Sequence, residues 1–450
     1  MTVNGGYLLF EPMKFLETGI NIFKAGSGKF LKPSLFSFRP TYNASLPLKP
    51  KGETCMSFKN APFVLAFGFL MFLSAAVPSA LWAADAAPVI TAAASAPAPD
   101  NNNSVDLVKR MGFGWNLGNT LEACGDWIKG GTVHNYETAW GNPDTTKEMI
   151  DEIKASGFKS IRIPVAWSNM IGNNYSINSA LLDRVKQIVD WSHKDQLIVV
   201  VNIHWDGGWW SKFPADYDKS LKRYTTLWTQ IAGYFKDYHN TLIFESLNEE
   251  GCFNDVWNRY GDSNPEHKQK AFGILNNINQ AFVDLIRKAG GQNAQRHLLI
   301  AGYATDIDLT TDPDFVMPKD PIHHLILSIH YYTPYTFAGL EKDETWGKMR
   351  PTWGTPADLA ELDANMQKLK VHFLDKGIPI ILGEYGATVK SKDPDSVRGY
   401  LLAVAEKSHD LGICPMLWDP GSHFNRKNLQ FNDPDLLKGF QKLMKGTSGN

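Results

Sequence analysis

The sequence predicts an α/β protein whose single folded domain is a (β/α)8 barrel, the TIM-barrel fold. Eight short apolar runs rich in β-branched residues follow one another between residues 105 and 446. Helical patterns separate these runs, as parallel strands require, because only a long crossover can join such strands. The runs are continuously apolar rather than alternating, which is typical of strands covered on both faces.

The predicted strands match a barrel of eight in number. They span residues 112–118, 160–165, 197–204, 241–249, 297–303, 325–332, 379–386 and 413–419. Apolar residues recur at helical spacing in the segments 147–156, 180–193, 271–289 and 400–408. In the first of these, Ile150 and Ile153 share a face and Gly157 can end the helix. We therefore expect strands and helices to alternate.

The rival fold is a doubly wound open sheet. Neither of the phosphate-cradling motifs, GxGxxG or GxxxxGK before Ser or Thr, is present in the sequence. The nearest segment, residues 26–29, lies far upstream of the first strand and lacks the pattern. We see no internal repeat and no second domain after the barrel. The strand count and the missing motifs favour the barrel.

The first hundred residues have a different organisation. Residues 61–77 carry no charge, Lys59 precedes them, and small residues follow as far as Ala86, which predicts a secretory signal peptide over 56–86. The alternative is a membrane anchor, if the leader is not cleaved. Translation could begin at Met56, so residues 1–55 are an extension of unassigned role. An Ala/Pro/Asn-rich linker over 87–104 then leads to the folded domain, 105–446, and we expect a secreted or periplasmic protein.

Charge and cysteine content exclude several classes of protein. Lys and Arg number 45 and Asp and Glu 47, so the net charge is −2, which does not favour a nucleic-acid partner or stable association with an anionic membrane. Four Cys in 450 residues exclude a disulfide scaffold. Export makes a Cys124–Cys252 bridge conceivable, but the sequence alone cannot pair them.

Polar residues gather where the predicted strands end. A strand covered on both faces carries Arg, His or Glu only where these side chains reach a cavity and find partners. In a barrel the C-terminal strand ends build the active site. The polar and aromatic residues at these ends are Asn116, Arg162, His204, Asn248, Glu249, Tyr303, His330, Tyr331, Tyr332, Glu384, Trp418 and Asp419.

Two carboxylates, Glu249 and Glu384, close the fourth and seventh strands, which face each other across a barrel of eight. Glycoside hydrolysis needs such a pair, with one carboxyl protonated as the acid and the other ionised. Arg162 is a candidate partner for the ionised group. A separation of about 5–5.5 Å would mean retention of anomeric configuration through a covalent intermediate, and a wider gap would mean inversion.

Five motifs make a resemblance specific. They are GWNLGNTL at 114–121, ETAWGNP at 137–143, GF and then IRIPVAW within 157–167, LNE at 247–249 and GEYG at 383–386. In this order and on these strands, the chain resembles glycoside hydrolases of family 5, of the endoglucanase (cellulase) type, over 105–445. The resemblance implies a retaining mechanism without a metal. We expect a monomer that acts on a β-glucan polysaccharide and needs no cofactor.

The resemblance also implies a role for each matched residue. Glu249 is expected to be the acid/base and Glu384 the nucleophile, while Arg162 keeps the nucleophile ionised. The remaining residues, expected to bind substrate or line the reactive subsite, are Asn116, His204, Asn248, His330, Tyr332 and Trp418. The Tyr331–Tyr332 doublet leaves the register open, and we choose Tyr332 because it shares a side of the strand with His330.

The chain departs from the family pattern at two positions. Many relatives carry a second His where Trp205 stands. Glu250 replaces the usual Pro after the acid/base, and we interpret it as a solvated loop residue; alternatively its charge could raise the pKa of Glu249.

Other motifs indicate no rival chemistry. His323 and His324 lack a third metal ligand at a recognisable spacing, and the G-x-S-x-G esterase elbow is missing. The loops are rich in Trp, which we expect as a group to contact sugar, at positions 140, 205, 209, 210, 257, 346 and 353. We therefore predict a secreted endo-β-1,4-glucanase. The alternatives are another β-glycan specificity, such as xyloglucan, lichenan or mannan, or a non-catalytic carbohydrate-binding barrel.

Overall fold

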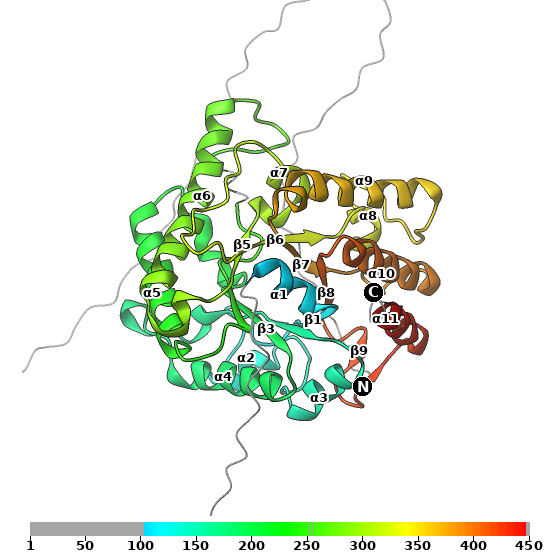
Figure 1. Ribbon diagram of the computed structural model, residues 1–450, viewed down its shortest axis with the longest axis horizontal. Helices are drawn as coiled ribbons and strands as arrows, with labels where there is room; N and C mark the ends of the chain where they lie inside the picture. The colour runs from blue at the N-terminus through cyan, green and yellow to red at the C-terminus, as the bar shows by residue number, and fades with distance from the viewer. Residues whose placement is uncertain (1–102, 252, 254, 447–450) are drawn as a thin grey trace, which may run out of the picture. The chain divides into compact units, whose positions relative to one another are not determined.

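The computed structural model describes residues 103–251, 253 and 255–446. Within them, eight parallel strands form a closed barrel, hydrogen-bonded in chain order with β8 returning to β1 (Figure 1). The predicted fold and all eight predicted strands are confirmed. The strands are β1 (Gly114–Leu117), β2 (Ser160–Ile163), β3 (Ile198–Asn202), β4 (Leu242–Glu245), β5 (Leu298–Ala301), β6 (Leu325–Tyr331), β7 (Ile380–Tyr385) and β8 (Cys414–Asp419).

Helices cover the outside of the barrel (Figure 1). They are α2 (Val133–Glu137), α3 (Lys147–Ala155), α4 (Ser179–Lys194), α5 (Tyr217–Tyr234), α6 (Pro265–Lys288), α7 (Ile307–Thr310), α8 (Tyr335–Ala338), α9 (Pro356–His372), α10 (Pro394–Asp410) and α11 (Pro434–Gly446). A two-stranded sheet, β9 (Phe424–Asn425) and β10 (Gln430–Phe431), follows β8.

The four predicted helices correspond to α3, α4, α6 and α10. Helix α6 begins six residues before the predicted start, because the Asn264 side chain caps it and Pro265 occupies its first turn. The polar character of residues 265–270 hid this turn from the search for apolar spacing.

Helix α1 (Ser104–Met111), which the sequence analysis did not predict, packs against one end of the barrel. Its Leu107, Val108 and Met111 are at most 1% exposed and join a cluster of inward-facing strand residues, which we call the lower layer. The lower layer comprises Ile198, Val200, Ile243, Leu299, Ile326, Ile381, Cys414 and Met416. Ser104, assigned to the linker from sequence, is therefore part of the folded domain.

A second set of inward-facing residues lies toward the C-terminal ends of the strands, and we call it the upper layer. On β3 the inward residues Ile198 and Val200 are followed by Asn202, and on β4 Ile243 is followed by Glu245. The period of two along a strand puts these residues on one face. The upper layer comprises Asn116, Arg162, Asn202, Glu245, Ser328 and Glu384, all buried.

Two shifts of register set the position of Glu384. The pairing of β6 with β7 shifts after Ile329, so that His330 lies opposite Glu384, and the pairing of β7 with β8 shifts between Leu382 and Tyr385. Such irregularities re-aim side chains near active sites.

The predicted signal peptide and almost all of the predicted linker lie outside the described residues. Among the residues described, no helix combines the length and the apolarity needed to span a bilayer.

Candidate active site

Glu384, near the end of β7, is held on both carboxylate oxygens. Its Oε1 accepts a hydrogen bond from Nη1 of Arg162 at 2.7 Å, and its Oε2 accepts one from the Tyr332 hydroxyl at 2.8 Å. The residue is 4% exposed. A charged donor and a hydroxyl donor together stabilise a negatively charged, rigidly oriented carboxylate.

Arg162 on β2 is the centre of the upper layer. Its Nε donates to Oε2 of Glu245 at 2.6 Å, and its Nη2 donates to Oδ1 of Asn248 at 2.8 Å. Burial alone would lower the pKa of the guanidinium, but the carboxylates of Glu245 and Glu384 raise it above its ordinary value. Arg162 therefore remains a cation although it is fully buried.

Glu245 is a functional residue that the sequence analysis missed. It is completely buried, and its second oxygen accepts from the Ser328 hydroxyl at 2.8 Å. The predicted fourth strand runs on to residue 249, which places Glu245 in its interior, whereas β4 ends at Glu245. An acidic residue in the apolar segment LIFE was the available signal.

Asn116 on β1 joins this network through its side-chain amide. Its amide nitrogen donates to the carbonyls of Gly383 and Met416 at 2.9 and 3.1 Å, and its oxygen accepts from Arg162 at 3.1 Å. Asn116 and Arg162 are both 0% exposed. The resemblance groups Asn116 with the residues that bind substrate, whereas the structure places it behind Glu384, where it orients Arg162.

Glu249 lies in the loop after β4 and faces Glu384. One of its carboxylate oxygens lies within 4.8 Å of one on Glu384, and its Oε1 is 2.7 Å from Nδ1 of His330. Its side chain is 46% exposed, and its carboxyl has the buried side chains of His330 and Glu384 on one side. Burial raises the pKa of Glu249 to about 7, against the opposing effect of Arg162. Glu249 can therefore hold a proton near neutral pH.

The two histidines are neutral near pH 7. Burial lowers the pKa of His330 to about 4, with Arg162 acting in the same direction and Glu384 opposing it. Burial, and then Arg162, hold the pKa of His204 well below its ordinary value. The His204 ring stacks parallel to Trp418, with centroids 5.7 Å apart and planes 3° apart. His204 and Trp418 thus present flat surfaces next to the carboxylate pair.

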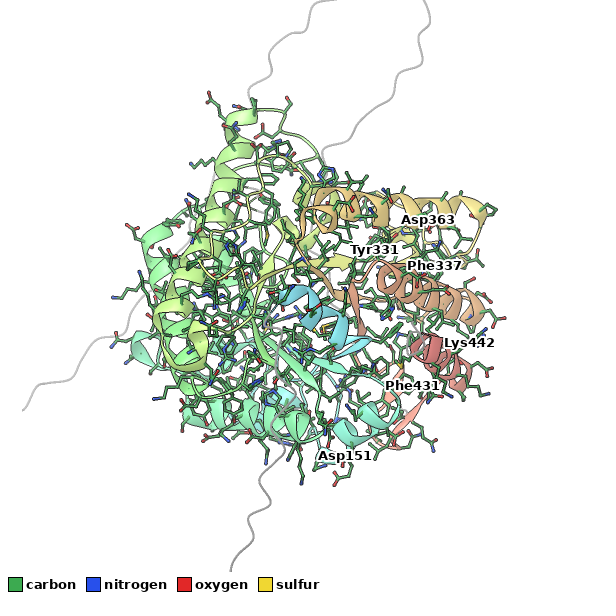
Figure 2. All side chains as sticks on the ribbon, in the orientation of Figure 1. Asp151, Tyr331, Phe337, Asp363, Phe431 and Lys442 are labelled. Carbon is green, nitrogen blue, oxygen red and sulfur yellow. The ribbon has the colours of Figure 1, made fainter. Side chains whose placement is uncertain are left out.

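The tyrosine doublet divides between two environments. Tyr332 binds Glu384, as described above. Tyr331 faces outward, stacks on Tyr400 of α10 with centroids 6.4 Å apart, and lies near Phe337 in the packing outside the barrel (Figure 2). The alternation of side chains along the strand thus brings Tyr332, and not Tyr331, to the carboxylates.

The interpretation of Glu250 as a solvated loop residue is wrong. Glu250 is 1% exposed, and neither carboxyl oxygen has a hydrogen-bond partner among the described residues. The backbone amide of Ala304 donates to the Glu250 carbonyl at 2.7 Å and so fastens this loop to the loop after β5. Burial, and to a lesser degree Glu249, raise the pKa of Glu250 well above its ordinary value. A neutral Glu250 exerts no charge repulsion on Glu249.

The loop tryptophans divide in a way the sequence did not predict. Trp209, Trp210 and Trp353 are between 2% and 8% exposed, so they pack in the core. The three half-buried members of the group are Trp140, Trp205 and Trp257. Trp346, at 57%, is the exposed member of the group. As a group, therefore, these side chains do not form one sugar-binding surface.

The carboxylate pair and His330 form a cluster of potential metal ligands. Glu249, His330 and Glu384 each have a potential ligand atom within 4.8 Å of the others, but the Arg162 cation already neutralises charge at this position, which opposes binding of a metal ion.

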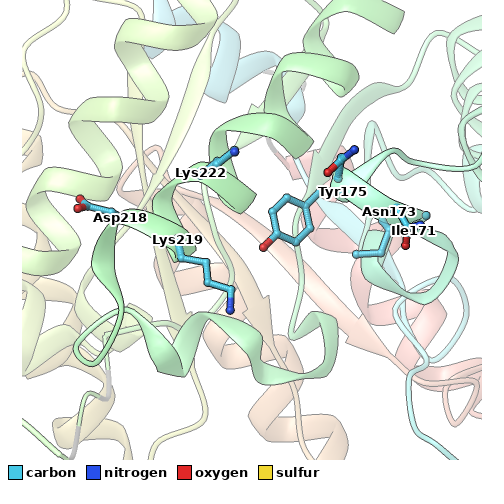
Figure 3. A pocket seen from close by; sticks show the side chains of 8 residues that line it. Ile171, Asn173, Tyr175, Asp218, Lys219 and Lys222 are labelled. Atoms are coloured by element: carbon cyan, nitrogen blue, oxygen red, sulfur yellow. The ribbon is translucent and has the colours of Figure 1, made fainter.

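An open hollow between the loop after β2 and helix α5 is lined by Ile171, Asn173, Tyr175, Asp218, Lys219 and Lys222, among others, and by none of the candidate site residues (Figure 3).

Residues 121–423 match the family model described as "Cellulase (glycosyl hydrolase family 5)". The chain belongs to glycosyl hydrolase family 5. Its relatives include Endoglucanase A of Paenibacillus barcinonensis, which is 34% identical over 76% of this chain and 90% of the relative. This family 5 chain is thus a glycoside hydrolase of the endoglucanase type, as the resemblance implied.

Other family 5 relatives differ in their named substrates. The xyloglucan-specific endo-β-1,4-glucanase of Bacteroides ovatus is 33% identical over 78% of this chain and 72% of that protein. A solved lichenase from Caldicellulosiruptor sp. F32, a mutant in complex with cellotetraose, is 34% identical with a TM-score of 0.70, covering 77% of this chain and 96% of that one.

Proposed function

We propose that this family 5 hydrolase is a retaining endo-β-1,4-glucanase that cleaves internal bonds of β-glucan chains. The observation that carries the proposal is the approach of Glu249 and Glu384 to within 4.8 Å of each other. A retaining enzyme has carboxyl groups about 5–5.5 Å apart, whereas an inverting enzyme leaves about 6.5–9.5 Å for a water molecule. An approach of two carboxylate oxygens to within 4.8 Å supports the retaining arrangement.

The reaction follows from the two environments. A Glu384 oxygen attacks the anomeric carbon, and the glycosidic C–O bond breaks as Glu249 gives its proton to the leaving oxygen. In the second step Glu249 takes a proton from water, the water oxygen attacks the anomeric carbon, and the bond to Glu384 breaks. The pKa of about 7 at Glu249 suits a group that first donates and then accepts a proton.

The neighbouring residues have supporting roles in this mechanism. Arg162 and Tyr332 hold Glu384 for attack, and His330 orients Glu249. Asn248 uses its amide oxygen to bind Arg162, which leaves its amide nitrogen as a donor for a sugar hydroxyl. Trp418 and His204 offer stacked faces to the pyranose ring that is attacked. We further propose that the chain acts as a monomer without a metal, and that residues 56–86 direct its export.

A second candidate specificity is a branched or mixed-linkage β-glucan, because relatives at 33–34% identity are named as a xyloglucanase and a lichenase. Hydrolysis of carboxymethylcellulose, lichenan, xyloglucan, glucomannan and xylan, with NMR of the first products, tests both points. We expect β-configured products and the highest rate on a β-1,4-glucan, with activity unchanged in EDTA. First products with α configuration would overturn the retaining mechanism.

A further inference from the structure

Two exposed aromatic side chains lie next to each other beyond the end of β6. Tyr335 begins α8 and is 42% exposed, and Trp346, in the following loop, is 57% exposed. Their ring centroids are 6.1 Å apart, with the planes inclined by 39°. Leaving two large rings in water forgoes the free energy that their burial would contribute, so an exposed aromatic pair suggests a ligand surface.

The segment that carries the rings is braced by hydrogen bonds. The amide of Glu344 donates to the Gly347 carbonyl at 2.9 Å, and that of Arg350 donates to the Thr336 carbonyl, also at 2.9 Å. The Tyr335 ring lies directly on Gly339, where an added Cβ would come within 2.3 Å of the ring. The rings are thus held in place before any ligand arrives, which lowers the entropic cost of binding.

This aromatic pair lies on the acid/base side of the site. Tyr335 follows β6, whose His330 lies 2.7 Å from Glu249, and in the closed barrel of eight β6 lies across from β2. The amide of Thr388, in the loop after Glu384, donates to the Ala338 carbonyl of α8 at 2.9 Å. Trp418, by contrast, extends from β8 and stacks on His204. Because Glu249 protonates the leaving oxygen, a surface beside it faces the leaving part of the substrate.

We propose that Tyr335 and Trp346 form a platform for the leaving-group side of a β-glucan chain, where their rings stack on the pyranose units released at the reducing end. Pyranose rings have apolar C–H faces, which pack on flat aromatic surfaces. The inference rests on the proposed function. It adds a second sugar-stacking surface, on the other side of the carboxylate pair from Trp418. It also assigns a role to Trp346, whose exposure no packing requirement explains.

The test is the position of the cut in cello-oligosaccharides labelled at the reducing end. Weakening a leaving-group contact disfavours binding modes that place many units on that side, so the cut moves toward the labelled end. We expect Trp346→Ala to lower the yield of the longer labelled fragments about 3- to 10-fold, on the scale of one aromatic contact. Trp346→Phe should restore most of the wild-type pattern.

Three controls make the outcome decisive. The rate on nitrophenyl β-cellobioside, which has no sugar on the leaving side, should change less than about twofold in Trp346→Ala, and its melting temperature should match the wild type. Trp127→Ala removes a ring of similar exposure, 51%, from the loop after β1 and should not move the cut toward the label. An unchanged pattern in Trp346→Ala, a shift away from the label, or the same shift in Trp127→Ala overturns the proposal. If the wild-type chain cleaves no cello-oligosaccharide, the proposed function itself fails.

Discussion

The lower and upper layers of the barrel interior use the same strands for opposite purposes. In the lower layer apolar side chains pack beneath helix α1, and each is at most 7% exposed. On β4 the next inward-facing residue after Ile243 is Glu245. Its carboxylate pairs with Arg162 and belongs to the charged network of the upper layer. The comparison teaches that a single strand can supply stability at its N-terminal end and chemistry at its C-terminal end.

The energetics of the two layers differ accordingly. Burial of apolar surface stabilises the lower layer by roughly 25 cal/mol per Å². In the upper layer, burial of Arg162 with Glu245 and Glu384 carries a desolvation cost, which the completed hydrogen bonds offset. Changes in the upper layer should therefore affect the rate, and changes in the lower layer should affect stability.

The largest effect is expected from Glu384→Gln. The amide cannot attack the anomeric carbon, so kcat/KM on β-glucan should fall on the order of 10⁴-fold or more. Cello-oligosaccharide binding, measured by calorimetry, should persist because the shape of the site is retained. A rate within tenfold of the wild type would remove Glu384 from the nucleophile role.

Glu245→Gln should reduce kcat about 10- to 100-fold with little change in KM, because Arg162 loses a charged partner and shifts relative to Glu384. Steady-state kinetics on one soluble β-glucan measures both constants. Ser328→Ala removes only the neutral donor to Glu245 and is the matched control, with an expected loss below about threefold. Equal losses in the two variants would contradict a charge-dependent role.

The pH profile tests the proton on Glu249. Its pKa is raised to about 7, so the acid form is present below that pH and is lost above it. On a substrate with a poor leaving group, kcat/KM should fall about tenfold per pH unit on the alkaline side. An activated dinitrophenyl glycoside needs little protonation and should show a much weaker decline. Identical profiles for both substrates would argue against acid catalysis by Glu249.

Leu107→Ala tests the lower layer. Removing a fully buried side chain from α1 should lower the free energy of unfolding by about 2–5 kcal/mol, while kcat at a temperature well below the transition stays unchanged. Lys109→Ala, on an exposed position of the same helix, should change stability by less than about 0.5 kcal/mol. Denaturant unfolding and kinetics on the same preparations separate the two effects.

The smallest effect is expected from Glu250→Gln. The folded-state pKa of Glu250 lies above its ordinary value of 4.5, so below that pH the side chain is protonated in both the folded and the unfolded chain and does not reduce stability. As the pH rises toward the folded-state pKa, the unfolded chain releases the proton and the folded chain keeps it, so the free energy of unfolding falls. The variant and the wild type should therefore melt together at pH 4, and the variant should melt higher at pH 8. A wild-type protein that is the more stable one at pH 8 would show that Glu250 is ionised and paired.

Sequence reasoning predicted the strands better than the helices and the strand ends better than the strand interiors. Continuous apolar runs marked every strand, since each is covered on both faces. Helix α1 is short and follows a polar segment, so no extended apolar period predicts it, and Glu245 falls inside a predicted strand that runs past the end of β4. Glu250, Trp209 and Trp210 are buried against expectation, because burial of a loop residue depends on loops from elsewhere in the chain, such as that of Ala304, whose amide hydrogen-bonds to the Glu250 carbonyl.

By itself the sequence determined the order of strands and helices, the family motifs and the residue types at the mouth of the barrel, because these depend on local spacing and on side-chain chemistry. Only the tertiary structure decided that Glu249 and Glu384 approach within 4.8 Å. Closure of the barrel and the shift of register at His330 set that approach, and both arise from hydrogen bonds between strands distant in the chain. Burial behaves in the same way, because the elements that cover a side chain come from elsewhere in the sequence.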